Sequence, residues 1–337
     1  MEKENKPVYT YSPASGYSVN NKAESELKSL RSVINAICFS LLLSVFLSAL
    51  AKRAISFALG LVFDITVLPT GQVLAHPALT YIISAAAYCV QLMVPTRVLI
   101  LLLGKRPDMA PLGKADSGRV VLGIPVLISL GIFGSVAANV IVSFLAGLDI
   151  HYAWPEQSIS TPFDLIMSVL VLAVLPALIE EYVFRGIIYG ALAPFGARMA
   201  ILGSALFFAL AHFNLLKFIN ALFIGLFLGF LVYRTGCLAV GIVLHFTNNF
   251  VSLVISYTQQ TVGLPDGVAM LFYAVVCLLG IVSAVYVAKK DKDAFSIQEE
   301  NMQNTLTVKI KAAFGSSGFI MAALVLAWVM LSSGRIA

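Results

Sequence analysis

Charged residues are scarce in this sequence of 337 residues. Asp, Glu, Lys and Arg together make up 12% of it, whereas hydrophobic residues make up 59% and the mean hydropathy is +0.92. An ordinary soluble domain cannot bury so large a hydrophobic share in one core. The composition therefore argues against a soluble enzyme or binding module and predicts a polytopic membrane protein.

Cysteine is rarer still. Only four cysteines occur; they lie far apart in apolar runs, and no pair has C-x-x-C spacing. This distribution suggests neither a disulfide framework nor a cysteine zinc site. We expect these side chains to serve in packing.

The familiar hydrolase motifs are missing as well. The zinc motif H-E-x-x-H is absent, because Phe-Asn-Leu-Leu follows His212 and Phe-Thr-Asn-Asn follows His245. An aspartyl pair is absent, since Asp64 and Asp164 are the only aspartates in the apolar runs. A serine nucleophile could come from Gly203-Ser204-Ala205, but this tripeptide is common in packed helices.

Long apolar runs are abundant. A membrane-spanning helix needs about 20 mostly apolar residues. The short run 54–68 contains Asp64 and follows Lys52 and Arg53, so we expect an interfacial or re-entrant piece there. The predicted fold is an all-α polytopic membrane protein with eight or nine transmembrane helices and a buried polar site between helices. The candidate spans are 33–50, 78–103, 120–146, 163–192, 199–213, 218–233, 237–257, 268–288 and 318–331.

The polar segments divide the chain. Residues 1–31 form a polar N-terminal segment that we expect in the cytoplasm, and residues 32–288 form the membrane domain, with its catalytic core at about 163–257. Residues 289–317 are predicted to be a polar linker, and residues 318–337 a C-terminal transmembrane helix.

The positive charges predict an orientation. Lys and Arg cluster before the first span and between the second and third, whereas loops 149–161 and 259–267 contain neither. Cytoplasmic loops carry such an excess, which explains the net charge of +5 without a nucleic-acid partner. The polar ends and the lack of an organellar signal favour a bacterial plasma membrane. The oligomeric state is not predicted.

Three charges interrupt the fourth apolar run. Ionisable residues within a membrane span are costly, so a functional role is the first hypothesis. Glu181 and Arg185 are four residues apart and share a helix face, whereas Glu180 is turned by about 100° from its neighbour. A buried ion network can account for Glu181 and Arg185. Glu180, without a cation of its own, is better suited to act as a general base.

Two histidines follow at helical spacing. Phe208 and His212 are four residues apart, and so are His245 and Asn249, so each pair shares a helix face. A lone intramembrane histidine more often bridges helices through a hydrogen bond. Two histidines, an asparagine and an acidic pair favour a catalytic site instead.

Peptide hydrolysis is the reaction that fits these groups. It needs a nucleophile, a proton acceptor and donors for the oxyanion that forms at the scissile carbonyl. With the other hydrolase motifs missing, water activated by a carboxylate and an imidazole remains. The alternatives are a transporter that uses the same residues as a proton relay, or a non-catalytic immunity or scaffold protein that uses them for packing.

At this point the sequence resembles the CAAX protease and bacteriocin-processing family (CPBP, or Abi) of intramembrane glutamate endopeptidases. The pattern E-E-x-x-x-R matches Glu180 to Arg185, F-x-x-x-H matches Phe208 to His212, and H-x-x-x-N matches His245 to Asn249. All three occur in the family's order, within roughly 163–257. Each motif is weak alone, whereas the ordered set is specific.

The resemblance implies a role for each residue. Glu180 and His212 would activate the hydrolytic water, His245 and Asn249 would stabilise the oxyanion, and Glu181 and Arg185 would order the site. Eukaryotic members cleave prenylated CAAX tails, whereas bacterial members are linked to peptide processing, immunity and membrane-protein regulation. We therefore expect a membrane-associated or lipidated peptide or protein as substrate, with the lipid bilayer as surroundings.

We expect no cofactor. A zinc site built from Glu180, His212 and His245 is the alternative, because three N/O ligands and a water suit catalytic zinc. The chain lacks the His–His pair four residues apart that zinc-binding helices favour.

Overall fold

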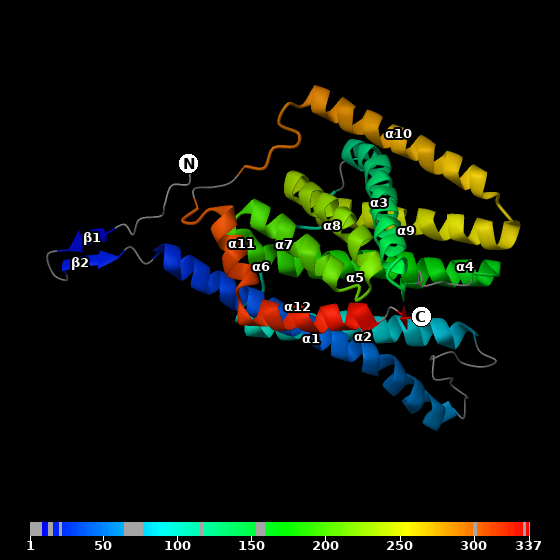
Figure 1. The fold of residues 1–337 in the computed structure, drawn as a ribbon, viewed down its shortest axis with the longest axis horizontal. Coiled ribbons are helices and arrows are strands. Elements are labelled where there is room, and N and C mark those ends of the chain that lie inside the picture. The colour runs from blue at the N-terminus through cyan, green and yellow to red at the C-terminus, as the bar shows by residue number, and fades with distance from the viewer. Residues whose placement is uncertain are drawn as a thin grey trace.

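The protein is a bundle of long helices (Figure 1). The computed structural model describes residues 9–12, 16–19, 22–63, 77–114, 117–152, 159–298, 302–332 and 335–336. The helices that frame the bundle are α1 (Lys22–Phe63), α2 (Pro77–Leu102), α3 (Ser117–Ala146), α10 (Asp266–Lys290), α11 (Leu306–Phe314) and α12 (Ser317–Ser332). Two short antiparallel pairs join β1 (Tyr9–Ser12) to β2 (Gly16–Val19) and β3 (Ile150–His151) to β4 (Arg335–Ile336).

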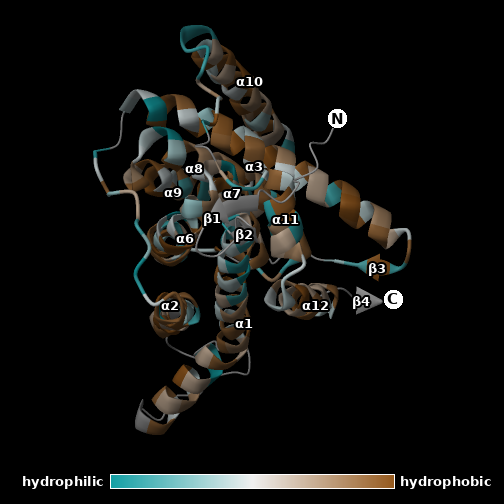
Figure 2. Cartoon of the chain, turned by 90° about the vertical axis from the view of Figure 1, so that its left-hand side faces the viewer, coloured by the Kyte–Doolittle hydropathy of each residue, from teal (hydrophilic) through white to brown (hydrophobic). Residues whose placement is uncertain are grey.

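The central elements follow one another closely in sequence. They are α4 (Pro162–Ser168), the π-helix η1 (Val169–Val174), α5 (Leu175–Glu180), the π-helix η2 (Glu181–Ile188), α6 (Tyr189–Leu192), the 3-10 turn η3 (Ala193–Phe195), α7 (Ala197–Leu210), α8 (Leu215–Thr235), α9 (Leu238–Tyr257) and the π-helix η4 (Thr258–Val262). Figures 1 and 2 place these elements between α1, α2 and α12 on one side and α3 and α10 on the other.

The helices are long and apolar enough to cross a membrane. In the described residues, seven helical segments qualify by length and composition, and an eighth is reached if α11 and α12, bent by 64°, count as one span. Hydrophobic residues dominate these helices in Figure 2, and hydrophilic ones gather at their ends and connections. The predicted all-α polytopic fold is confirmed.

Two of the predicted elements need correction. The expected span 199–213 is α7, a helix of only 14 residues, so within the described chain a ninth helix of spanning length is not found. The run 54–68 was expected to be a separate interfacial piece, but its residues 54–63 continue α1 as one helix of 42 residues. α1 contains no proline, and its first glycine is Gly60. No helix-breaking residue therefore separates this run from the earlier part of α1. The rest of that run, with Asp64, lies outside the described residues.

Caps fix the ends of the helices around the centre. Thr161 caps α4 in a capping box with Asp164, whose backbone N–H donates to the threonine hydroxyl at 3.1 Å. Asn214 caps α8 by accepting hydrogen bonds from Leu216 and Lys217. Gly236, at φ +59°, ends α8 in the left-handed conformation that glycine tolerates. Together these caps fix where α4 begins and where α8 begins and ends.

Lys309 anchors the segment expected to be a polar linker. Its side chain is 2% exposed, although it lies on the short helix α11. The ammonium group lies 2.9 Å from Glu26 at the start of α1 and donates a 2.8 Å hydrogen bond to the carbonyl of Phe195. Part of the predicted linker is therefore a packed helix that joins α1 to the turn before α7.

Candidate active site

The two glutamates stand at a change of helix type. Glu180 is the last residue of α5, and Glu181 is the first residue of the π-helix η2. A π-helix has wider turns than an α-helix and occurs often at functional sites. Pro176 lies in the first turn of α5 and has no N–H for the carbonyl four residues before it, that of Leu172. The local sequence therefore disturbs regular α-helical bonding next to the site.

Glu181 and Arg185 form the buried pair that their spacing predicted. Both side chains are 0% exposed, and the guanidinium lies 3.0 Å from the Glu181 carboxylate. Arg185 also donates to the carbonyl of Gly225 at 3.2 Å and lies 4.3 Å from the ring centroid of Phe208. These contacts join η2 to α7 and α8. Because a buried charge is costly without partners, the pair stabilises the fold only while both members are present.

His245 lies between the two glutamates. Its Nδ1 is 2.8 Å from Glu181 Oε1, and its Nε2 is 3.6 Å from Glu180 Oε2. A carboxylate only accepts hydrogen bonds, so Nδ1 carries the proton that Glu181 accepts. On the next turn of α9 toward its start, a Cβ added to Gly241 would lie 2.8 Å from Glu181 Oε2. The glycine therefore allows α9 to approach Glu181 closely.

Glu180 has different partners from Glu181. Its side chain is 12% exposed, and in the described chain neither Lys nor Arg comes within ion-pair distance of it. It accepts a hydrogen bond from the hydroxyl of Tyr88 on α2. Glu180 is thus the less paired carboxylate, as its position in the sequence indicated.

Asn249 lies one turn beyond His245 on α9. Its amide donates to the carbonyl of Leu172 at 3.3 Å, the carbonyl that Pro176 cannot serve. Its amide oxygen accepts from Asn248 at 3.3 Å. An asparagine amide has two N–H donors, so one remains for a ligand.

The ring of Phe208 lies between His212 and the other site residues. Its Nδ1 is 2.9 Å from the carbonyl of Phe208, which can only accept, so this nitrogen carries the proton and Nε2 is left as an acceptor in the neutral ring. The Phe208 ring lies 5.0 Å from the His212 ring and 5.7 Å from the His245 ring, edge to face in both cases. The Phe208 side chain therefore contacts both histidines and Arg185.

Tyr88 is the site residue that sequence reasoning missed. It lies far from the motifs in sequence, and a tyrosine in an apolar run has no special meaning alone. Its spacing held the available signal: Tyr81 and Tyr88 are seven residues apart, on one face of α2. The hydroxyl of Tyr81 donates to Asp164 at 3.2 Å, as that of Tyr88 does to Glu180. One face of α2 thus contacts Asp164 in the first turn of α4 and Glu180 at the end of α5.

Two alternatives from the sequence, a serine nucleophile and a zinc site, can be compared with this geometry. The Ser204 hydroxyl is buried and donates to the carbonyl of Ile201 at 3.2 Å, one turn back on its own helix. In the described ranges, no group of three or more His, Cys, Asp or Glu side chains is arranged to hold a metal ion. The zinc alternative at Glu180, His212 and His245 is left to the chelator test below.

The helices that carry the three motifs lie largely within a region that matches one known protein family. Residues 162–251 match the family model described as "Type II CAAX prenyl endopeptidase Rce1-like". This region is similar to Rce1-like endopeptidases. It begins at the first residue of α4 and ends within α9, so it contains all six charged and polar residues singled out in the sequence. The match agrees with the CPBP family, and with the membrane helices it supports an intramembrane peptidase in general terms.

The match to the family model covers residues 162–251. No curated protein and no solved structure shows significant similarity to the chain. Tyr88 on α2 lies outside the matched residues, although its hydroxyl contacts Glu180 within them.

Proposed function

We propose that this protein is an intramembrane endopeptidase that hydrolyses a peptide bond of a membrane-associated or lipidated peptide or protein. The observation that carries the proposal is the position of His245, whose two ring nitrogens face two different carboxylates, at 2.8 Å and 3.6 Å. The Rce1-like match supports the peptidase class. The residue roles, the substrate and the absence of a cofactor are part of the proposal.

In this proposal Glu180 and His212 activate the attacking water. Glu180 suits the task because it is partly exposed and has no Lys or Arg partner in the described chain. The Nδ1 proton of His212 is committed to a backbone carbonyl, which leaves Nε2 able to accept a proton. The water proton passes to one of these groups while the water oxygen bonds to the scissile carbon.

His245 and Asn249 would then hold the oxyanion. Nδ1 of His245 already donates to Glu181, so Nε2 can donate to an oxyanion only if the ring carries both protons. Glu181 and Glu180 both face the ring, at 2.8 Å from Nδ1 and 3.6 Å from Nε2. Asn249 adds its unused N–H without any titration. This gives Glu181 a definite part: it accepts the hydrogen bond from Nδ1 and so orients the His245 ring.

The proton balance closes within the same residues. When the tetrahedral intermediate collapses, the carbon–nitrogen bond breaks and the leaving amine takes the proton that Glu180 or His212 accepted from water. The products are a new carboxylate and a new amine. No other reactant is required.

We also propose that the N-terminus faces the cytoplasm, in a bacterial plasma membrane. The loops expected on that side meet in the structure, since Arg119 donates to the carbonyl of Arg234 at 3.0 Å and Arg234 pairs with Asp291 at 3.1 Å. A gathering of basic residues at one end of the helices is what the positive-inside rule expects of the cytoplasmic face.

The test is cleavage of membrane-anchored peptides by the purified protein in detergent. The panel pairs each sequence with and without a prenyl group, and compares wild type with Glu180→Ala and His212→Ala, with and without a chelator. We expect both variants to lose about 10²-fold to 10⁴-fold in rate, with no effect of the chelator. The control is His151→Ala, because His151 is exposed on β3.

Each other outcome has a definite meaning. Loss of wild-type cleavage on chelation would favour the metal alternative. Cleavage by Glu180→Ala at the wild-type rate would overturn the proposal. Absence of cleavage by the wild type together with transport driven by a pH gradient in vesicles would favour the proton relay.

Tyr88→Phe should slow cleavage by about tenfold without unfolding the protein. The change removes one hydrogen bond to a carboxylate, worth about 1.5–3 kcal/mol, and leaves the ring in place. The effect should fall on kcat rather than KM, because Tyr88 orients Glu180 and is not expected to hold substrate. The comparison is Tyr81→Phe, whose hydroxyl bonds Asp164 instead. Equal effects of the two changes on kcat would argue against a specific role of Tyr88.

A further inference from the structure

A hollow lies away from the residues proposed for catalysis. It has a volume of about 460 Å³ and lies between the start of α3 and the ends of α8 and α10. This volume falls within the range of about 300–1,000 Å³ found for small-molecule sites. It is lined by Gly118, Arg119, Leu122, Gly123, Val126, Phe227, Phe230, Leu231, Arg234, Ser283, Ala284, Tyr286, Val287, Lys290, Asp291, Ala294 and Phe295.

This hollow and the catalytic cluster lie on different faces of α8. Phe227, Phe230 and Arg234 line the hollow and follow one another at helical spacing. A Cβ on Gly225 would instead meet Phe208 and Ala205 of α7, on the side of the catalytic cluster. The hollow is therefore a separate site.

The packing of α3 explains why space remains. α3 contacts both α8 and α10, and α10 approaches it so closely that a Cβ on Gly280 would overlap the hydroxyl of Ser129. Beyond that contact, toward the end of α10, the side chains of Ala284 and Val287 face the hollow together with Phe230. The Phe230 ring stacks on Phe295, with centroids 6.2 Å apart, and closes one side.

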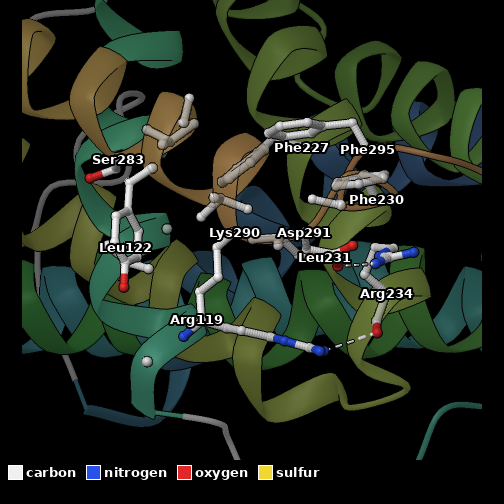
Figure 3. A pocket seen from close by; sticks show the side chains of 17 residues that line it. Arg119, Leu122, Phe227, Phe230, Leu231, Arg234, Ser283, Lys290, Asp291 and Phe295 are labelled. Atoms are coloured by element: carbon white, nitrogen blue, oxygen red, sulfur yellow. Dashed lines mark hydrogen bonds and ion pairs between the residues drawn. The ribbon is translucent and has the colours of Figure 1, made fainter.

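The charges of the hollow gather at one end. Figure 3 shows Arg119, Lys290 and Arg234 along one rim, with the ring of Phe227 farther away. Arg234 pairs with Asp291, so the lining holds three cations and one carboxylate, a net charge of +2. The remaining walls are mainly hydrocarbon. A positive rim above an apolar body is complementary to a molecule with an anionic head and an apolar chain.

We propose that this hollow binds an anionic glycerophospholipid, with one acyl chain along Leu122, Phe230 and Val287 and its phosphate at the rim of Arg119, Arg234 and Lys290. The rim lies at the end of the helices where the basic loops meet, so a phosphate there would stand at headgroup depth. A free phosphate would leave the apolar walls unused. Basic pockets between membrane helices are known to hold the head groups of anionic lipids.

The proposal predicts a preference for anionic lipid. Native mass spectrometry of the detergent-solubilised protein should show tighter retention of phosphatidylglycerol than of phosphatidylcholine with the same acyl chains. The double variant Arg119→Gln/Lys290→Gln should weaken phosphatidylglycerol binding by roughly thirtyfold, at about fivefold for each cation near the headgroups. The matched control is Lys105→Gln/Lys114→Gln, which removes two exposed cations of the preceding loop outside the hollow.

A second variant tests the apolar body. Ala284→Trp would fill the hollow and should reduce binding of both lipids, whereas Ala274→Trp, exposed on the same helix outside the hollow, should not. Melting temperatures show whether each variant is folded. Equal retention of phosphatidylglycerol by wild type and by both hollow variants would overturn the proposal, as would displacement of the lipid by a prenylated peptide. Glu180→Gln should bind lipid like the wild type, which separates this site from the proposed catalysis.

Discussion

Glu180→Gln should reduce peptide cleavage by about 10²-fold to 10⁴-fold and leave the fold intact. The amide keeps the shape of the side chain and can still accept the hydrogen bond from Tyr88. It cannot take a proton from water at neutral pH. The measurement is the single-turnover cleavage rate of a membrane-anchored peptide in detergent, with the melting temperature as the check on folding.

The matched control for this change is Glu24→Gln, an exposed glutamate in the first turn of α1. It makes the same chemical replacement away from the site and should leave the rate unchanged. A Glu180→Gln protein that keeps more than half of the wild-type rate would show that Glu180 is part of a packing network and not a base.

Arg185→Met should destabilise the protein by about 3–5 kcal/mol, because it removes the arginine partner of the buried Glu181 carboxylate and leaves that group only its hydrogen bond from His245. The double variant Glu181→Leu/Arg185→Met removes both charges and should recover most of that loss, since well-packed apolar residues replace a buried ion pair at little cost. The measurement is reversible unfolding in mixed micelles. A double variant as unstable as the single one would contradict this view of the pair.

Activity should separate from stability in the same variants. His245 donates to Glu181, so the double variant loses the acceptor that orients the ring. We expect it to be folded but at least 10²-fold slower in cleavage, the scale of losing one oxyanion donor. A stable and fully active double variant would mean that Glu181 does not act through His245.

The helical spacing of the motifs predicted much of this site. Residues four apart share a helix face, and Glu181 with Arg185 forms such a pair in the structure. The lengths of the apolar runs predicted the long helices. Within a membrane the backbone must satisfy its own hydrogen bonds, so a long apolar run forms a helix. These features depend on the local sequence alone.

The features that the sequence did not predict depend on irregular helix geometry and on packing between helices. The regular α-helix turns Glu180 by about 100° from Glu181, whereas in the structure both carboxylates face His245, at the junction of α5 and η2. Pro176 was the local sign of irregular bonding, but it does not by itself specify a π-helix. Tyr88 meets Glu180 only through the packing of α2, which no spacing within the motifs encodes. The predicted span 199–213 had a run shorter than the roughly 20 residues that a spanning helix needs, and α7 with its 14 residues is about as short.

The most direct test is an experimental structure of the Glu180→Gln protein with an uncleaved peptide bound. The account predicts the scissile carbonyl oxygen within about 2.7–3.1 Å of both His245 Nε2 and Asn249 Nδ2, with the carbonyl carbon facing residue 180. A peptide bound with that oxygen beyond hydrogen-bonding reach of both side chains would contradict it.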